Sequence, residues 1–362
     1  MDKRDQSKKD EIILRQLEVI RSMTEHNLSR MGADFWGTPT PEKHVPVAPL
    51  PEKEKRIPPA DGGEKKAPEA AEQKQEDTAK APPKENIEDL QKELDSYVGL
   101  SAVKREVKDL INLAAVERLR RQHGLPTADM SLHMVFSGNP GTGKTTIARL
   151  MARVYHSLGI LSKGQLVEVD RSGLVAGYVG QTAIKTRKVI DSALGGVLFI
   201  DEAYALVNQE NGNDFGREAI EVLLKNMEDH RKDLVVIVAG YSQLMEKFIH
   251  SNPGLESRFN KYFYFEDYDG AQLFTILQSM CDKNGYVLTP EGEALARREL
   301  MDLYEDRDEN FGNARDVRNL FEQAVARQSD RVARLEAPTR EQLMELRPED
   351  LTEPGVAPSP KD

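Results

Sequence analysis

The segment from Gly138 to Thr146 carries residue types at a spacing that binds phosphate groups. It reads Gly138, Asn139, Pro140, Gly141, Thr142, Gly143, Lys144, Thr145 and Thr146. Two glycines that bracket four residues, followed by Lys and Thr, form the phosphate-loop pattern. Glycines let the backbone curl until its N–H groups converge on phosphate oxygens, and the N-terminus of a following helix adds partial positive charge. We expect Lys144 to reach the β- and γ-phosphates of a nucleotide and the Thr145 hydroxyl to ligate Mg²⁺.

The residues on either side supply the strand and the helix that such a loop needs. Met134-Val135-Phe136 is a short, β-prone apolar run, and residues 146–154 place apolar side chains on one helix face. A glycine-rich turn that matches the pattern by chance is the alternative. The strand before the loop and the helix after it argue against that alternative.

Two acids, Asp201 and Glu202, follow the apolar run 196–200. The carboxyl end of a buried parallel strand lies beside the ligand crevice of an open α/β sheet. We expect Asp201 to hold Mg²⁺, through water or through the Thr145 hydroxyl, and Glu202 to polarise the attacking water. Two solvated charges at a strand end are the alternative.

Strand patterns at 134–136, 166–169, 196–200, 234–239 and 262–265, all but the second of them apolar runs, alternate with helical patterns. Uninterrupted apolar strands between helices indicate a parallel sheet that is covered on both faces. From Tyr268 onward the pattern is helical, at 270–283, 290–304 and 313–333. The sequence therefore predicts an α/β fold, a doubly wound, five-stranded parallel P-loop sheet, followed by a small helical lid.

Composition divides the chain into successive parts. Residues 1–36 form an amphipathic helical segment, which either docks a partner or lies loosely on the body. Residues 37–85 are rich in Pro, Glu and Lys and bury too little apolar surface to offset their ordering entropy, so we expect a disordered linker. The α/β domain is expected at 86–267 and the lid at 268–335. Residues 336–362 are expected to be a disordered tail, in which 340–346 could form a helical turn or two.

The bulk composition excludes several classes of protein. A formal net charge of −11 over 362 residues argues against a dedicated nucleic-acid binder. The single cysteine, Cys281, rules out an internal disulfide and suits a reducing compartment. The sequence shows neither an apolar run long enough to span a bilayer nor the apolar core of a signal peptide. We expect a cytoplasmic protein without membrane insertion, without a nucleic-acid partner and without a metal beyond Mg²⁺.

The body of the chain resembles AAA+ ATPases of the CbxX/CfqX family over roughly residues 86–335. The matching segments are GNPGTGKTT, LSKGQLVEVDR, GYVGQTAIKT, GVLFIDEAY, FGREAIEVLLKNMED, VIVAGY, NPGLESRF and GNARDVRN. The resemblance implies ATP and Mg²⁺ as cofactors and hydrolysis of ATP to ADP and phosphate. It also implies a homo-hexameric ring that pulls on a protein client, which the sequence does not identify.

The resemblance also assigns roles to two kinds of arginine. Arg258 matches the segment that places an arginine finger into the neighbouring subunit, where a guanidinium offsets charge on the γ-phosphoryl oxygens. Arg315 matches the lid arginine that senses the γ-phosphate. Arg318, one turn further on, competes for that role, and either arginine could instead pair with an acid such as Glu322.

Two loops resemble binding elements of the family. Tyr178 and Val179 match the aromatic pore loop that grips a polypeptide, although Tyr178 could instead anchor its loop to the body. Val98 and Gly99 match the hydrophobic wall near the adenine, although an ordinary turn between helices is the alternative. At the end of the fourth strand, where AAA+ proteins commonly present Asn or Thr, this chain has Gly240-Tyr241-Ser242, and no role is assigned there.

We therefore interpret the chain as an ATP-driven protein-remodelling motor, with sporulation as one setting. A CbxX-type rubisco activase is the alternative within the family. A nucleotide-switched scaffold with a slow ATPase is the alternative from another class. A clamp-loader-like DNA machine is disfavoured by the acidic charge balance and by the aromatic pore loop.

Overall fold

The computed structural model describes residues 83–126, 131–178, 180–207, 215–308 and 311–352. These residues belong to one compact unit, which begins at Lys80. The expected N-terminal helix, nearly all of the expected linker, Val179 and the last ten residues of the chain lie outside the described residues.

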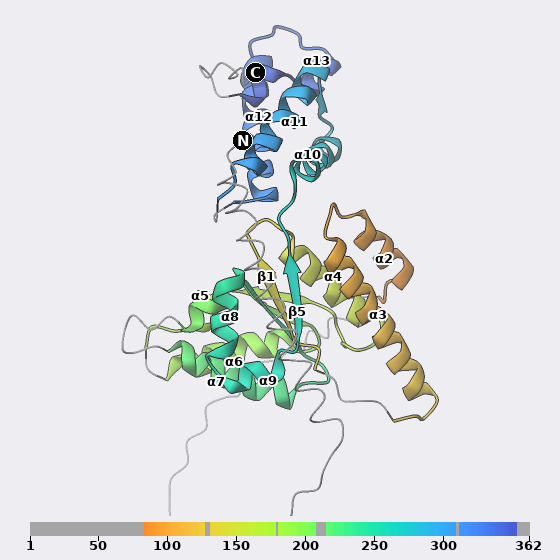
Figure 1. The fold of residues 1–362 in the computed structure, drawn as a ribbon, viewed down its shortest axis with the longest axis vertical. Coiled ribbons are helices and arrows are strands. Elements are labelled where there is room, and N and C mark those ends of the chain that lie inside the picture. The colour runs from red at the N-terminus through yellow and green to blue at the C-terminus, as the bar shows by residue number, and fades with distance from the viewer. Residues whose placement is uncertain (1–82, 127–130, 179, 208–214, 309–310, 353–362) are drawn as a thin grey trace, which may run out of the picture. The chain divides into compact units, whose positions relative to one another are not determined.

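A five-stranded parallel sheet organises the first part of this unit (Figure 1). Its strands are β1 (Met134–Gly138), β2 (Leu166–Val169), β3 (Val197–Ile200), β4 (Val235–Gly240) and β5 (Lys261–Phe265), in the spatial order β2-β3-β4-β1-β5. Every residue of β3 and β4 is buried, as expected for inner strands of a sheet covered on both faces. The predicted doubly wound α/β fold is confirmed.

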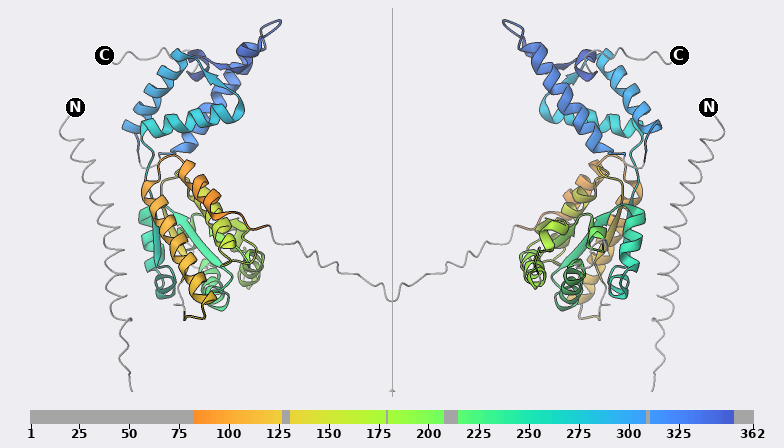
Figure 2. Two further views of the ribbon diagram at one scale, coloured as in Figure 1. Left: turned by 90° about the vertical axis from the view of Figure 1, so that its right-hand side faces the viewer. Right: turned by 90° about the vertical axis from the view of Figure 1, so that its left-hand side faces the viewer.

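Alternate strand residues face two separate cores. Phe136 and Phe199 pack with α2 (Ile87–Ser96), α3 (Ser101–Gln122) and α4 (Lys144–Ser157). Val135 and Leu198 point the other way, into a core shared with α6 (Gln181–Ala193), α7 (Gly216–Asp229), α8 (Ser242–His250) and α9 (Pro253–Arg258). The two side views in Figure 2 show these helix layers on opposite faces of the sheet.

Several short elements connect the strands and were not expected from the sequence. They are α5 (Arg171–Leu174), the 3₁₀ helix η1 (Ala203–Val207), α8 and α9. The start of α9 is fixed locally, because the Asn252 side chain accepts a hydrogen bond from the Gly254 N–H and Pro253 occupies the first helical position.

The lid contains α10 (Gly270–Asn284), α11 (Pro290–Glu305) and α12 (Ala314–Val332) around its own core. Buried apolar residues from all three helices meet there, including Phe274, Leu300 and Val317. Asp269 starts α10 with a capping box, and Thr289 caps α11 ahead of Pro290. Among the described residues, no helix has the length and apolar character that crossing a bilayer requires.

The expectation of a disordered tail from residue 336 is wrong for the part that the structure describes. Residues 336–352 contain α13 (Arg340–Met344), β7 (Glu345–Leu346) and α14 (Pro348–Leu351), and β7 pairs in parallel with β6 (Val287–Leu288). Leu346 and Leu351 join the core of the lid. The proline content that suggested disorder has another cause, since Pro348 occupies the first turn of α14.

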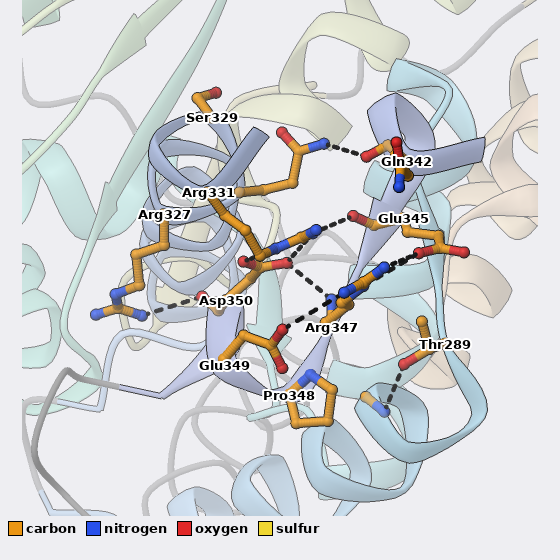
Figure 3. A network of polar contacts seen from close by, with 12 residues as sticks. Thr289, Arg327, Ser329, Arg331, Gln342, Glu345, Arg347, Pro348, Glu349 and Asp350 are labelled. Carbon is orange, nitrogen blue, oxygen red and sulfur yellow. Dashed lines mark hydrogen bonds and ion pairs between the residues drawn. The ribbon is translucent and has the colours of Figure 1, made fainter. Parts of the chain in front are cut away.

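A buried ion pair holds this C-terminal segment on α12 (Figure 3). Arg331 donates from Nε to Oδ1 of Asp350 at 3.0 Å and from Nη2 to Oδ2 at 2.7 Å. The Arg347 N–H donates to the same carboxylate at 2.9 Å. Asp350 is only 1% exposed, so these donors replace the water that a carboxylate would otherwise bind.

Candidate active site

The phosphate loop leaves β1 at Gly138 and enters α4 at Lys144. Two of its glycines are required by close backbone contacts. A Cβ on Gly138 would lie 2.3 Å from the carbonyl oxygen of Phe265, and a Cβ on Gly141, at φ +72°, would lie 2.0 Å from that of Gly312. The loop therefore packs directly against the lid as well as against β5.

The start of α4 has the donor set of an anion site. Its N-cap is Gly143, no side chain caps its free N–H groups, and no acid lies in its first turn. Lys144 donates to the carbonyl oxygens of Gly138 at 2.9 Å and Asn139 at 2.7 Å. Burial lowers the pKa of Lys144 to about 8, although the nearby Asp201 opposes this shift.

Asp201 and Glu202 lie at the same edge of the sheet, because β3 and β1 are parallel and only β4 separates them. The Glu202 N–H donates to Oδ1 of Asp201 at 3.0 Å. Glu202 has a φ of +48°, which is unusual for a residue with a side chain and costs roughly 1–3 kcal/mol. The Glu202 side chain is exposed to solvent. The surrounding structure must therefore maintain the strained backbone without help from burial of this side chain.

Two tyrosines lie beside the end of β4: Tyr241 directly follows this strand, and Tyr204 belongs to η1. The rings of Tyr204 and Tyr241 lie 6.2 Å apart, and a Cβ on Gly240 would lie 2.7 Å from Cδ1 of Tyr204. Burial, followed by the charge of Glu202, raises the pKa of Tyr204 to about 12. Tyr204 therefore keeps a donor hydroxyl beside the acids, a residue that the sequence analysis did not single out.

The lid contributes Arg315 to this edge of the sheet. Arg315 lies in the first turn of α12, and its charge is close enough to lower the pKa of Lys144. Its N–H donates to the Gly312 carbonyl at 2.9 Å, while the neighbouring Ala314 N–H donates to Gly141 of the phosphate loop at 3.3 Å. These contacts favour Arg315 over Arg318 as the lid arginine nearest the phosphate loop.

The structure does not bring Arg258 to the phosphate loop of the same chain. Arg258 precedes β5, whereas the loop follows the parallel neighbour β1, so the length of a strand, roughly 16 Å at 3.3 Å per residue, separates them. The guanidinium lies 3.5 Å from Glu228 and 3.4 Å from the Gly254 carbonyl. Its buried Nε has no hydrogen-bond partner in the part of the chain that the structure describes.

Tyr178 stands at the tip of a loop whose base is held firmly. Side chains of α6 bond to the backbone below the tip: Thr182 to Ala176, Lys185 to Ser172 and Val175, and Thr186 to Leu174. Tyr178 itself is 74% exposed, and a Cβ on Gly177 or Gly180 would meet no atom within 4 Å. The ring therefore does not anchor the loop to the body; Val179 lies outside the described residues.

The turn at Val98 and Gly99 lies beside the phosphate loop and the start of the lid. Gly99 has a φ of +61°, and its Cβ would lie 3.2 Å from both Tyr268 and Gln272. The next residue, Leu100, is also left-handed and contributes apolar surface to the cores of both domains. This placement is compatible with the expected wall near an adenine.

Comparison with known proteins adds the family. Residues 134–267 match the family described as "ATPase family associated with various cellular activities (AAA)", and residues 269–357 match the "AAA lid domain". The second match extends past residue 335, in agreement with the folded C-terminal segment.

Curated relatives cover the same part of the chain. Protein CbbX of Cereibacter sphaeroides is 47% identical over 69% of this chain and 79% of that protein. The chloroplastic ribulose bisphosphate carboxylase/oxygenase activase of Cyanidioschyzon merolae is 45% identical over 68% of this chain and 83% of that protein. Stage V sporulation protein K of Bacillus subtilis is 40% identical over 74% and 83%. With these identities and with both domain profiles matched in order, the chain belongs to the AAA ATPases, in the CbxX/CfqX family.

Proposed function

We propose that this chain hydrolyses ATP at the interfaces of a ring, most simply a homo-hexamer, and uses the energy to remodel a protein client. The observation that supports the shared site is the position of Arg258, which lies a full strand length from its own phosphate loop. A head-to-tail ring joins one surface of each subunit to a different surface of its neighbour, so we infer that Arg258 acts on the phosphate loop of the next subunit.

The phosphate loop binds the triphosphate of ATP. The uncapped N–H groups of α4 and the Lys144 ammonium provide the donors, and the left-handed glycines keep side chains out of the path of the phosphates. The Thr145 hydroxyl and the Asp201 carboxylate are hard oxygen donors that fit Mg²⁺ together with phosphate oxygens. When bound, Mg²⁺ neutralises charge on the β- and γ-phosphates.

Glu202 orients and deprotonates the attacking water. Its exposed carboxylate follows Asp201 at the carboxyl edge of the sheet, on the same edge as the loop. Its strained backbone is maintained by the hydrogen bond from its N–H to Asp201. Tyr204 is close enough to Glu202 for the carboxylate to raise its pKa, and we infer that its protonated hydroxyl donates to the attacking water.

Two arginines act on the γ-phosphoryl group from different chains. Arg315 approaches from the lid of the same subunit, while Arg258 enters from the neighbour. A guanidinium spreads positive charge over the oxygens that gain charge in the transition state, and an arginine of this kind contributes about 10³-fold or more to the rate.

Tyr178 contacts the client. A large exposed aromatic ring on a held loop offers apolar contact to any polypeptide, independent of its sequence. The names of the relatives include a rubisco activase and a sporulation protein, so they support remodelling of a protein and leave the client class to experiment.

The proposal is tested first by its chemistry. Lys144→Ala should abolish ATP binding, whereas Glu202→Gln should bind ATP and fail to release phosphate, because the two residues serve binding and water activation separately. ATP affinity and phosphate release are measured for both variants. Turnover by Glu202→Gln at the wild-type rate would show that Glu202 is not the base.

Substitutions of Tyr178 distinguish a protein-remodelling motor from a nucleotide-switched scaffold. Tyr178→Ala should keep subunit assembly and basal hydrolysis but lose stimulation by client proteins. Tyr178→Phe keeps the aromatic side chain and should therefore behave as wild type. ATPase rates are measured with unfolded model polypeptides and with proteins trapped by Glu202→Gln. A scaffold predicts no client-stimulated hydrolysis in any of the three proteins.

A further inference from the structure

A partly buried polar cluster joins the phosphate loop to the lid at the hinge between the two domains. It consists of Asn139 from the loop, Asp267 from the hinge and Asn313 from the residue that precedes α12; we call it the hinge triad. Asp267 is the last residue of the AAA match, and the lid match begins at residue 269. The triad therefore lies where the lid must rotate if it moves.

The carboxylate of Asp267 is the shared acceptor of the triad. Asn139 donates its amide N–H groups to both oxygens, at 3.0 and 3.1 Å. Asn313 donates to Oδ1 at 2.7 Å, and Arg307 of the lid lies 3.9 Å from Oδ2. Two amides and a guanidinium from three separate segments thus depend on one side chain.

Asn313 is fully buried and held in a strained conformation. Its φ of +54° and ψ of −127° are rarely adopted by a residue with a side chain. The Asn313 side chain accepts the Tyr268 N–H at 2.8 Å, and the hydroxyl of Tyr268 donates to Thr142 of the loop at 3.2 Å. Such strain persists only where surrounding contacts over-determine the geometry. The contacts that do so here reach into the phosphate loop.

The loop end of the triad responds to the position of Lys144. The Asn139 carbonyl accepts the Lys144 ammonium at 2.7 Å. When the Lys144 ammonium turns toward phosphate oxygens, the Asn139 carbonyl loses its hydrogen-bond donor, and the position of Asn139 must then change. Because the Asn139 side chain is bonded to Asp267, the adjustment reaches Asn313, which lies two residues before Arg315.

We propose that the hinge triad couples the contents of the phosphate loop to the angle of the lid and thereby positions Arg315 for hydrolysis. This inference rests on the proposed ATPase mechanism and adds to it a route between nucleotide and lid. Asp267 and Asn313 are positioning residues, since they act through Arg315 and need not touch the nucleotide.

The polarity of the triad suggests a swap experiment. In Asp267→Asn an amide faces the amides of Asn139 and Asn313, and in Asn313→Asp a carboxylate faces Asp267, so each change breaks a bond. The double variant Asp267→Asn/Asn313→Asp restores a donor and an acceptor in the pair. Residue 267 then donates to residue 313 and still accepts from Asn139, whereas the bonds from Asn313 to the Pro140 and Phe311 carbonyls, both 3.3 Å, are lost. The total charge is unchanged.

Lid movement is measured by energy transfer between dyes on Asp330→Cys in α12 and Lys188→Cys in α6, both exposed positions. The native Cys281 is 3% exposed and its pKa is raised to about 11 by burial, so it labels slowly. Labelled chains are diluted into unlabelled chains to remove transfer between subunits. Transfer is compared without nucleotide, with ADP and with a non-hydrolysable ATP analogue, and kcat and KM are measured without labels.

Each single variant should reduce the analogue-dependent transfer change and lower kcat by about fivefold or more, the lower bound of typical coupling between sites. KM for ATP should change by less than about threefold, because Lys144 and the loop N–H groups remain. The swap variant should regain a higher kcat and a larger transfer change than either single variant, but less than wild type, because residue 313 no longer donates to the Pro140 and Phe311 carbonyls. If the single variants do not fold, Asn139→Ala, which leaves Asp267 bonded to Asn313, should show the same loss.

Wild-type kcat and wild-type transfer changes in Asp267→Asn and in Asn139→Ala would overturn the inference. A wild-type protein that hydrolyses ATP without any change in transfer would overturn it too, while leaving the proposed function intact. A wild-type protein that binds no ATP would instead contradict the proposed function.

Discussion

Removal of the Asp350 carboxylate tests whether the C-terminal segment is part of the lid. Among the described residues, Asp350→Ala leaves the Arg331 guanidinium with one hydrogen bond, to the Glu345 carbonyl at 3.1 Å, and leaves the Arg347 N–H without its acceptor. Breaking a buried ion pair from one side typically costs 3–5 kcal/mol. Because the Arg331 side chain is 19% exposed and can recover some water, we expect about 3 kcal/mol, the lower end of that range.

For a domain of the size of the lid, a loss of this magnitude lowers the Tm by about 12 °C or more. The assay is hydrogen exchange of peptides from α12 and from residues 340–351, together with thermal unfolding. Glu349→Ala is the matched control, because Glu349 is exposed and its pair with Arg347 is 3.9 Å long, so we expect a change of at most about 0.5 kcal/mol. Equal exchange in the two variants would refute the role of the buried pair.

The remaining predictions concern pH and the N-terminus. Burial lowers the pKa of His133 to about 4, so as pH falls this histidine is protonated in the unfolded chain before it is protonated in the folded one. About 3 kcal/mol of the free energy of unfolding should therefore be lost between pH 6.5 and pH 4. Denaturant titrations should show this loss, and His133→Asn should lack it; parallel curves would contradict it. The lowered pKa of Lys144 predicts that kcat/KM for ATP falls about tenfold between pH 7 and pH 9, whereas a flat profile would contradict it. Deleting residues 1–82 keeps Glu85, which bonds Arg153 at 2.7 Å, so the Tm and the basal ATPase rate should stay unchanged; a loss of either would show that the removed segment stabilises the body.

The sheet and the phosphate loop could be predicted because their signals are local. The strands β3 and β4 have no polar side chain at any position, and the order of glycines before Lys144 has few other uses. Local signals also existed for the C-terminal segment but were outweighed by its composition. Thr339 and Gln342 form a capping box, and Pro348 occupies a first helical turn.

The hinge triad could not be predicted, because its members are 128 and 46 residues apart in sequence. Only the pairing of β5 beside β1, followed by the return of the lid, brings Asp267 to Asn139. Asn313 lies within the matching segment GNARDVRN, but the sequence analysis assigned roles there only to the arginines. The exposure of Tyr178 likewise depends on tertiary packing, since a tyrosine between glycines can anchor a loop or stand free.

The shared active site is tested most directly by mixing two inactive variants. Arg258→Ala lacks the guanidinium donated to its neighbour, and Glu202→Gln lacks its own base. At a 1:1 ratio, about a quarter of the interfaces in a randomly mixed ring pair an intact base with an intact arginine from the adjoining subunit. Phosphate release from the mixture should therefore approach a quarter of the wild-type rate, while each variant alone stays near zero. A mixture as inactive as its components, together with wild-type hydrolysis whose specific rate is independent of protein concentration, would contradict the shared site.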